Sequence, residues 1–318
     1  MNEKLIERIA RATGCPELVD ILAERLSVSD LQSLLLEIYA RRVRNVTPAG
    51  LLQAYRANRF VRPSIVDPAL FAAFDLKAFS LLPTGFEAVE LSPLCPLGTC
   101  AAVAPVNQNN IVCALRATEL VADATNVLAL ECALRRKEIR GRGGDLRGAA
   151  KLAASHRHVR AQSISDEKYT AHFKVFCLAT AGRDTGGLAF EIENAREHLD
   201  FYLRLLYEVV DFKDPAAGRV EVFVTDLSGK NADVLKREVL DALAVRFPGA
   251  SFALDPGRRA GIGYYTGLCF NIRIAGRKSG TYDNLVDGGL ADWTQKLLTD
   301  KKERFLASGI GSELFQKI

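Results

Sequence analysis

Two strand-like segments joined by only six residues limit most strongly what this chain can fold into. Residues 155–162 and 169–180 have the pattern of strands, and the link between them, 163–168, is polar. A link this short joins antiparallel strands, because parallel strands need a crossover of a dozen or more residues. The chain therefore contains a β-hairpin, and its sheet is antiparallel or mixed.

Strands and helices follow one another along the rest of the chain from residue 85. Further strands are expected at residues 86–91, 111–116, 219–227 and 264–274. Helices are expected at residues 126–140, 189–210, 233–246 and 285–298. Because at least one strand pair is a hairpin, this order predicts an α+β fold, with a largely antiparallel sheet flanked by helices.

The first 57 residues differ from the remainder because they predict helices alone. Residues 31–44 form one of these helices, and Thr47 followed by Pro48 is a typical cap and first residue of the next. A connector rich in proline and aromatic residues follows. We therefore expect an N-terminal helical segment with its connector, 1–82, and a core, 83–318.

Composition indicates a protein of the cytoplasm. The apolar and charged fractions of the 318 residues are ordinary, and the net charge is +4. The N-terminus lacks the apolar region of a signal peptide, and no apolar run reaches the roughly 20 residues that cross a bilayer. Seven scattered cysteines indicate reduced thiols rather than a disulfide framework. We expect no contact with a membrane.

Positive charge is concentrated between residues 134 and 160, where nine Lys or Arg face two acids. Two interpretations stay open for this stretch. It is a solvated, glycine-broken loop between two elements, or it is a surface that attracts the phosphates of a nucleotide or RNA.

Several short segments occur in an order that resembles one protein family. They are 85–93 (GFEAVELSP), 156–160 (HRHVR) with 172–176 (HFKVF), 261–267 (GIGYYTG), 280–285 (GTYDNL) and 309–314 (GIGSEL). In this order they resemble the motifs of histidyl-tRNA synthetases, which are class II aminoacyl-tRNA synthetases, and of their paralogue, the regulatory subunit of ATP phosphoribosyltransferase. The resemblance covers residues 85–318. It implies an antiparallel sheet of six or seven strands flanked by helices, in a cytosolic and usually dimeric protein.

The departures from the family pattern fall on charged positions. The resemblance implies that Arg157 contacts the α-phosphate of ATP and that Phe173 stacks on adenine. Val159, however, stands where the family has a glutamate for adenine, and Leu314 stands where an arginine clamps the triphosphate. Loss of one electrostatic contact to a transition state typically costs about 10²–10³ in rate, so little aminoacylation is expected.

Enough polar groups remain to hold a small ligand. Residues 115–119 (LRATE) lie near the family's Leu-Arg-Pro-Glu-Gly-Thr stretch, whose acid and hydroxyl hold the α-amino group of the substrate. Arg259 stands next to Ala260, where the family has an arginine. The candidate ligand-binding residues are Arg116, Thr118, Glu119, Arg157, His172, Phe173, Arg259, Tyr264 and Tyr265. Hydrogen bonding along a strand edge, with Tyr264 in the core, is the alternative interpretation of this cluster.

The histidines of the hairpin do not predict a metal site. His156 and His158 share one face of a strand. A register that pairs Val159 with His172 puts the third histidine on the other face, and a slip of one residue would reverse that. Zinc needs three or four ligands at once, so we expect no metal.

These observations lead to three hypotheses. The first is a class II synthetase-like paralogue without normal aminoacylation that binds an amino-acid-like or nucleotide-like small molecule. It would act as a regulatory or accessory protein, as a homodimer or with a protein partner. The second is an adenylate-forming ligase that uses ATP and magnesium on a non-tRNA acceptor. The third is an RNA-binding module that uses residues 135–160 and the N-terminal helices.

Overall fold

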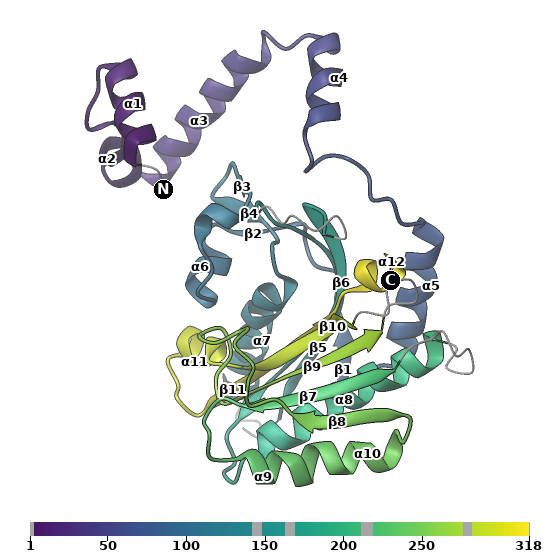
Figure 1. Ribbon diagram of the computed structural model, residues 1–318. Coiled ribbons are helices and arrows are strands. Elements are labelled where there is room, and N and C mark those ends of the chain that lie inside the picture. The colour runs from purple at the N-terminus through teal and green to yellow at the C-terminus, as the bar shows by residue number, and fades with distance from the viewer. Residues whose placement is uncertain (1–2, 142–147, 163–168, 211–218, 276–281, 318) are drawn as a thin grey trace.

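One sheet of eight strands forms the centre of the computed structural model, which describes residues 3–141, 148–162, 169–210, 219–275 and 282–317 (Figure 1). The strand order is β1-β5-β6-β11-β10-β9-β7-β8. The strands are β1 (Phe86–Ala88), β5 (Ala150–Val159), β6 (His172–Arg183), β7 (Val220–Asp226), β8 (Ala250–Leu254), β9 (Leu268–Ala275), β10 (Tyr282–Ala291) and β11 (Glu303–Ile310).

The sheet is mixed, with an antiparallel centre. The strands from β5 to β7 in this order pair antiparallel, while β1 and β8 each add a parallel strand at one edge. The β5–β6 hairpin is confirmed, and it pairs Val159 with His172. The α+β fold, with a largely antiparallel sheet, is therefore confirmed.

Helices cover both faces of the sheet. On one face α8 (Ala189–Val209) packs with α5 (Pro68–Ser80) over a core that includes Phe176 and Phe270. The helical run α9 (Ala232–Leu235), η4 (Lys236–Asp241) and α10 (Ala242–Arg246) continues this layer. On the other face α7 (Ala124–Gly141) and α11 (Trp293–Leu298) enclose a second core that includes Leu152 and Phe305.

A small three-stranded sheet lies beside the large one and forms where a single strand, 111–116, was expected. Its strands are β2 (Leu94–Pro96), β3 (Cys113–Ala114) and β4 (Thr118–Leu120), accompanied by α6 (Thr99–Val103) and η2 (Gln108–Asn110). The expected strand is cut short because the chain turns back at Arg116 and Ala117, whose φ angles are +66° and +51°.

The expected helix 285–298 is wrong in its first half, which is strand β10 in the middle of the sheet. Gly288 permits this placement: a Cβ there would lie 2.5 Å from the Cβ of Ser308 and 2.6 Å from the ring of Phe270. The neighbouring strands approach so closely that only glycine fits between their side chains. The helix is confined to α11, which begins at Trp293.

The N-terminal helices stand away from the sheet (Figure 1). They are α1 (Glu3–Thr13), α2 (Leu18–Asp20), η1 (Ile21–Arg25), α3 (Val28–Val43) and α4 (Pro48–Ala57), and they contain no buried residue. Thr47 caps α4 by accepting from the Gly50 amide, with Pro48 at the first position, as expected. The last helix, α12 (Ser312–Lys317), returns to α5 and β6. None of the helices in the described ranges combines the length and hydropathy needed to cross a membrane.

Candidate functional site

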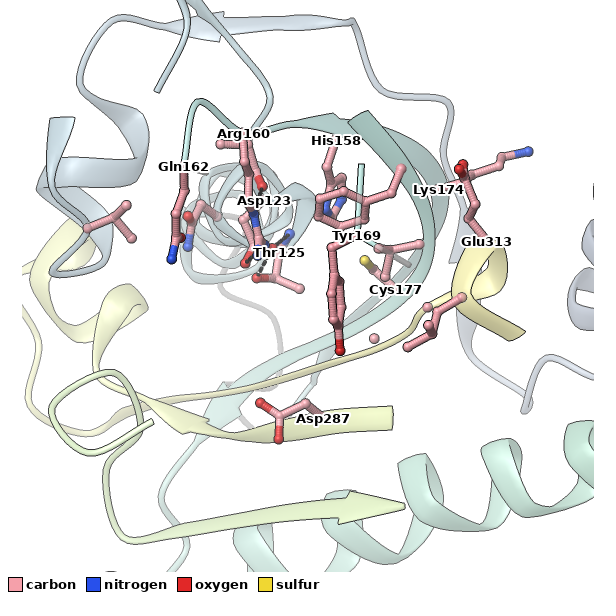
Figure 2. A pocket seen from close by; sticks show the side chains of 18 of the residues that line it. Asp123, Thr125, His158, Arg160, Gln162, Tyr169, Lys174, Cys177, Asp287 and Glu313 are labelled. Atoms are coloured by element: carbon pink, nitrogen blue, oxygen red, sulfur yellow. Dashed lines mark hydrogen bonds and ion pairs between the residues drawn. The ribbon is translucent and has the colours of Figure 1, made fainter. Parts of the chain in front are cut away.

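A cavity of about 560 Å³ opens where the β5–β6 hairpin, the start of α7 and the loop 261–265 meet. Strands β10 and β11 and helix α12 complete its wall. Its size lies in the range typical of small-molecule sites. In Figure 2 Asp123, Thr125, His158 and Arg160 gather at one side, and Asp287 extends from β10 at the other.

Asp123 is held in the cavity wall by three hydrogen bonds and one ion pair. Its Oδ1 accepts from the Thr125 hydroxyl (2.7 Å) and amide (3.0 Å), its Oδ2 accepts from the Tyr264 hydroxyl (3.0 Å), and Arg160 Nη2 lies 3.5 Å away. Burial raises the pKa of Asp123, but Arg160 and the Thr125 hydrogen bonds outweigh it, so the pKa lies below its ordinary value. This carboxylate is a fixed negative charge at neutral pH.

A second acid, Asp287, faces the cavity from β10. Its Oδ2 accepts from the Tyr265 hydroxyl (3.0 Å), and its Oδ1 pairs with Arg258 Nη2 (2.7 Å). Burial raises the pKa of Asp287 in spite of these two partners. The adjacent tyrosines 264 and 265 thus each tether one acid of the cavity.

Two buried polar side chains that line the cavity have unused hydrogen-bonding atoms among the described residues. Asn126 is fully buried, and neither its amide nitrogen nor its amide oxygen has a partner. His158 Nε2 accepts from the Ala124 amide (3.1 Å), which leaves the proton on Nδ1, also without a partner. Burial lowers the pKa of His158 to about 3, so the ring is a neutral donor.

Three of the nine residues expected from the sequence line this cavity: Phe173, Tyr264 and Tyr265. The ring of Phe173 is covered by the guanidinium of Arg160 at 5.1 Å and meets the ring of His158 edge-on at 5.4 Å. The expected aromatic surface is present, and its neighbours are cationic and polar.

Arg157 and His172 do not line the cavity, because they occupy the alternate face of the hairpin. Arg157 Nη1 donates to Glu313 Oε2 (2.8 Å) and lies 3.1 Å from His172 Nδ1. The other ring nitrogen of His172 contacts the Arg62 carbonyl. These side chains fasten the connector and α12 to the hairpin.

The segment 115–119 also lies outside the cavity wall. Glu119 is fully buried and accepts from the amides of Gly98 (2.8 Å) and Cys100 (3.1 Å) and from the side chain of Gln108 (2.7 Å). Thr118 donates to the Leu115 carbonyl (2.8 Å), and Arg116 is exposed at the turn. These groups stabilise the small sheet and the start of α6.

Sequence reasoning missed Asp123 and Thr125. The sequence did contain a signal for them. Residues 120–125 read LVADAT, with an acid and a hydroxyl at the same spacing as in the family's Leu-Arg-Pro-Glu-Gly-Thr stretch. This segment begins five residues after residues 115–119, which were compared with that stretch. Arg259 is exposed outside the cavity, and its neighbour Arg258 is the buried partner of Asp287.

The basic stretch 134–160 is largely neutralised within the described residues. Arg136 pairs with Glu303 and both side chains are fully buried, while Arg135 pairs with Glu87 and Glu131. Arg140 Nη2 lies 3.4 Å from Asp300. Residues 142–147 of this stretch lie outside the described ranges.

The two triphosphate contacts expected from the resemblance are not available in this cavity. Leu314 lines the cavity where a clamp was expected, and the Arg157 guanidinium is paired with Glu313. Across the described ranges no three His, Cys, Asp or Glu side chains are grouped to hold a metal ion.

No model of a known protein family and no curated protein matches this sequence. Solved structures do match its fold. An apo histidyl-tRNA synthetase from S. aureus gives a TM-score of 0.59 at 14% identity, over 80% of this chain and 67% of that one. An ATP phosphoribosyltransferase regulatory subunit/histidyl-tRNA synthetase from Bacillus halodurans gives 0.57 at 14% identity, over 82% of each chain. A histidine–tRNA ligase subunit from Alicyclobacillus acidocaldarius gives 0.55 at 12% identity, over 80% of this chain and 96% of that one. The chain therefore has the class II synthetase-like fold that its motifs indicated.

Proposed function

We propose that this chain is a class II synthetase-like accessory protein that binds the zwitterionic head of an amino acid in the cavity beside Asp123. The observation that carries the proposal is the pairing of this fixed carboxylate with Arg160 at the cavity wall. An ammonium group fits against Asp123, and a carboxylate fits against the half-exposed guanidinium of Arg160. Phe173, Tyr264 and Tyr265 supply the aromatic part of the same wall.

The unused polar atoms of Asn126 and His158 support a ligand in this cavity. A buried donor or acceptor without a partner costs about 1–3 kcal/mol, and Asn126 leaves two such atoms and His158 one. A polar ligand, with its waters, would satisfy them. Such uncompensated groups are typical of binding sites rather than of cores.

An accessory role is favoured over catalysis by what the cavity wall lacks. Leu314 brings no charge to the wall, and Arg157, which lies outside the wall, is paired with Glu313. One structure of the same fold is described as an ATP phosphoribosyltransferase regulatory subunit/histidyl-tRNA synthetase. By analogy of fold, we extend the proposal to a homodimer that acts on a protein partner in the cytoplasm.

Thermal unfolding in the presence of each of the twenty L-amino acids tests the proposal. A ligand at 100 times its Kd stabilises the folded state by about 2.7 kcal/mol, which raises Tm by a few degrees. The same amino acid with its amino group replaced by hydroxyl should give no shift. Asp123→Asn, which keeps a partner for Tyr264 and Thr125, should weaken binding at least tenfold.

Asp233→Asn, at an exposed position of α9, is the matched control and should bind as the unaltered protein does. The proposal fails if no amino acid shifts Tm, or if the Asp123 variant binds with unchanged affinity. Stabilisation by ATP with magnesium alone would favour the ligase hypothesis instead.

A further inference from the structure

The segment 41–62, here called the arginine arm, carries six arginines and no acid. They are Arg41, Arg42, Arg44, Arg56, Arg59 and Arg62. The acids that precede and follow it in the chain are Glu37 and Asp67, and no lysine occurs between Lys4 and Lys77. The net charge of the whole chain is only +4. The arm is therefore a local concentration of positive charge, and all of that charge is carried by arginine.

The charge of the arginine arm is exposed and nearly uncompensated. The arm comprises the end of α3, helix α4 and the start of the connector, which project from the core in Figure 1. Of its arginines, Arg41 alone pairs with an acid among the described residues: Glu37, one turn earlier, with 72% of the arginine side chain exposed. A pair this open neutralises little. Within the described ranges Arg59 donates to the Ala161 and Gln162 carbonyls, which are uncharged and leave its positive charge intact.

Aromatic rings alternate with these charges. The guanidinium of Arg59 lies 4.5 Å from the centre of the Phe60 ring, and that of Arg62 lies 5.5 Å from the Tyr55 ring. Tyr55 is 41% exposed and Tyr39, on α3, is 54% exposed. Exposed aromatic rings near guanidinium groups offer surfaces on which bases stack and groups that bind phosphates.

We propose that the arginine arm is a nucleic-acid-binding surface that meets the cavity only at Arg59, among the described residues, and that acts independently of the function proposed for the cavity. Guanidinium groups bind phosphate oxygens in bidentate pairs, and neutralising phosphates releases condensed counterions. The arm is bent, because its charges lie on two helices and a connector that run in different directions (Figure 1). A bent arm of this kind suits a strand passing along it better than a flat lipid surface, on which one continuous amphipathic helix would lie.

Ion pairing distinguishes the two parts of the nucleic-acid surface expected from the sequence, residues 135–160 and the N-terminal helices. In residues 135–160, Arg136 is buried against Glu303, and Arg135 is shared between two glutamates. Ion pairs in the fold neutralise the charges of Arg135 and Arg136. Arg42, Arg44 and Arg56, in contrast, have no ion pair within the described residues. The density of positive charge along the sequence is similar in residues 135–160 and in the arginine arm. Only the arginine arm keeps most of its charge free of ion pairs within the described residues.

Fluorescence anisotropy with the full chain tests the proposal. The probes are a labelled single-stranded RNA and the DNA of the same sequence, each about 20 nucleotides long and of mixed composition, titrated between about 50 and 200 mM salt. We expect a Kd that weakens steeply with salt. Each released counterion contributes about fivefold at 0.1 M salt, so R42E/R44E/R56E should weaken binding about 100-fold and flatten the salt dependence.

The matched control is R237E/K301E/K302E, which changes the net charge equally at exposed positions of the core. It should bind nucleic acid within a fewfold of the unaltered protein. Preference for one probe tells whether RNA or DNA is the ligand. Three results overturn the proposal: no binding to either probe at 50 mM salt, equal losses in the two triple variants, or binding confined to anionic lipid vesicles or an acidic protein.

Discussion

Replacing Arg136 should destabilise this protein more than most single changes can. Its guanidinium donates to both oxygens of Glu303, at 2.9 and 3.0 Å, and neither side chain has any exposed surface. In Arg136→Met the Glu303 carboxylate stays buried, and two cations remain near it in the described part of the chain, Arg183 at 3.7 Å and Arg140 at 3.9 Å. Removing one partner of a buried pair costs about 3–5 kcal/mol, a large share of a typical free energy of unfolding of about 5–15 kcal/mol.

Urea unfolding, followed by fluorescence of the single, buried Trp293, measures this cost. The double variant Arg136→Met/Glu303→Leu should recover most of the loss, because a buried pair replaced by apolar side chains is often neutral. The expected coupling between the two positions is therefore at least about 3 kcal/mol. The reasoning is refuted if the single variant lies within about 1 kcal/mol of the unaltered protein, or if the double variant loses as much as the two single variants combined.

Two further predictions concern the sheet and its pH dependence. Gly288→Ala should lower the free energy of unfolding by about 1–3 kcal/mol, because the alanine Cβ would overlap Ser308 and Phe270. An unchanged urea midpoint would contradict this prediction and show that the neighbouring strands can move apart. Burial lowers the pKa of His158 and of His198 to about 3. The unfolded state therefore binds more protons below pH 6.5, and stability falls as the pH drops from 6.5 towards 3, by about 1.4 kcal/mol per pH unit for each ring. Urea midpoints between pH 7 and 5 should fall less steeply for His198→Gln, and equal slopes would contradict the assignment.

Local sequence rules were sufficient for the hairpin because its geometry depends on neighbours along the chain. A six-residue link and two strand patterns gave the pairing, and the register that joins Val159 to His172 was among those considered. The cap at Thr47 follows from local chemistry in the same way. The number of strands did not follow, since β8 and β11 were not expected and β10 was taken for a helix.

Strand β10 shows why longer-range structure escapes such rules. Residues 285–291 read LVDGGLA, which supports either helix or strand when read alone. The choice is made by β9 and β11, which enclose β10 and accept only glycine at 288. Residues 285–291 become a strand because they are buried between two other strands of the sheet. The local sequence pattern contains no information about this burial.

The candidate site was predicted only in part, because strand parity, and not residue type, decides which side chains line the cavity. Arg157 was selected as a phosphate ligand, yet β5 turns His158 to the cavity and Arg157 to the opposite face, where Glu313 pairs with it. Arg160, just beyond the end of β5, reaches the cavity and Asp123. The hairpin register fixes which residues share a face, but the packing of α7 against one side of the sheet decides which face is inside. The cavity therefore has a positive charge at Arg160, three residues along the chain from Arg157, and this charge stands beside an acid. That pairing favours a zwitterion over a triphosphate as the ligand of this cavity.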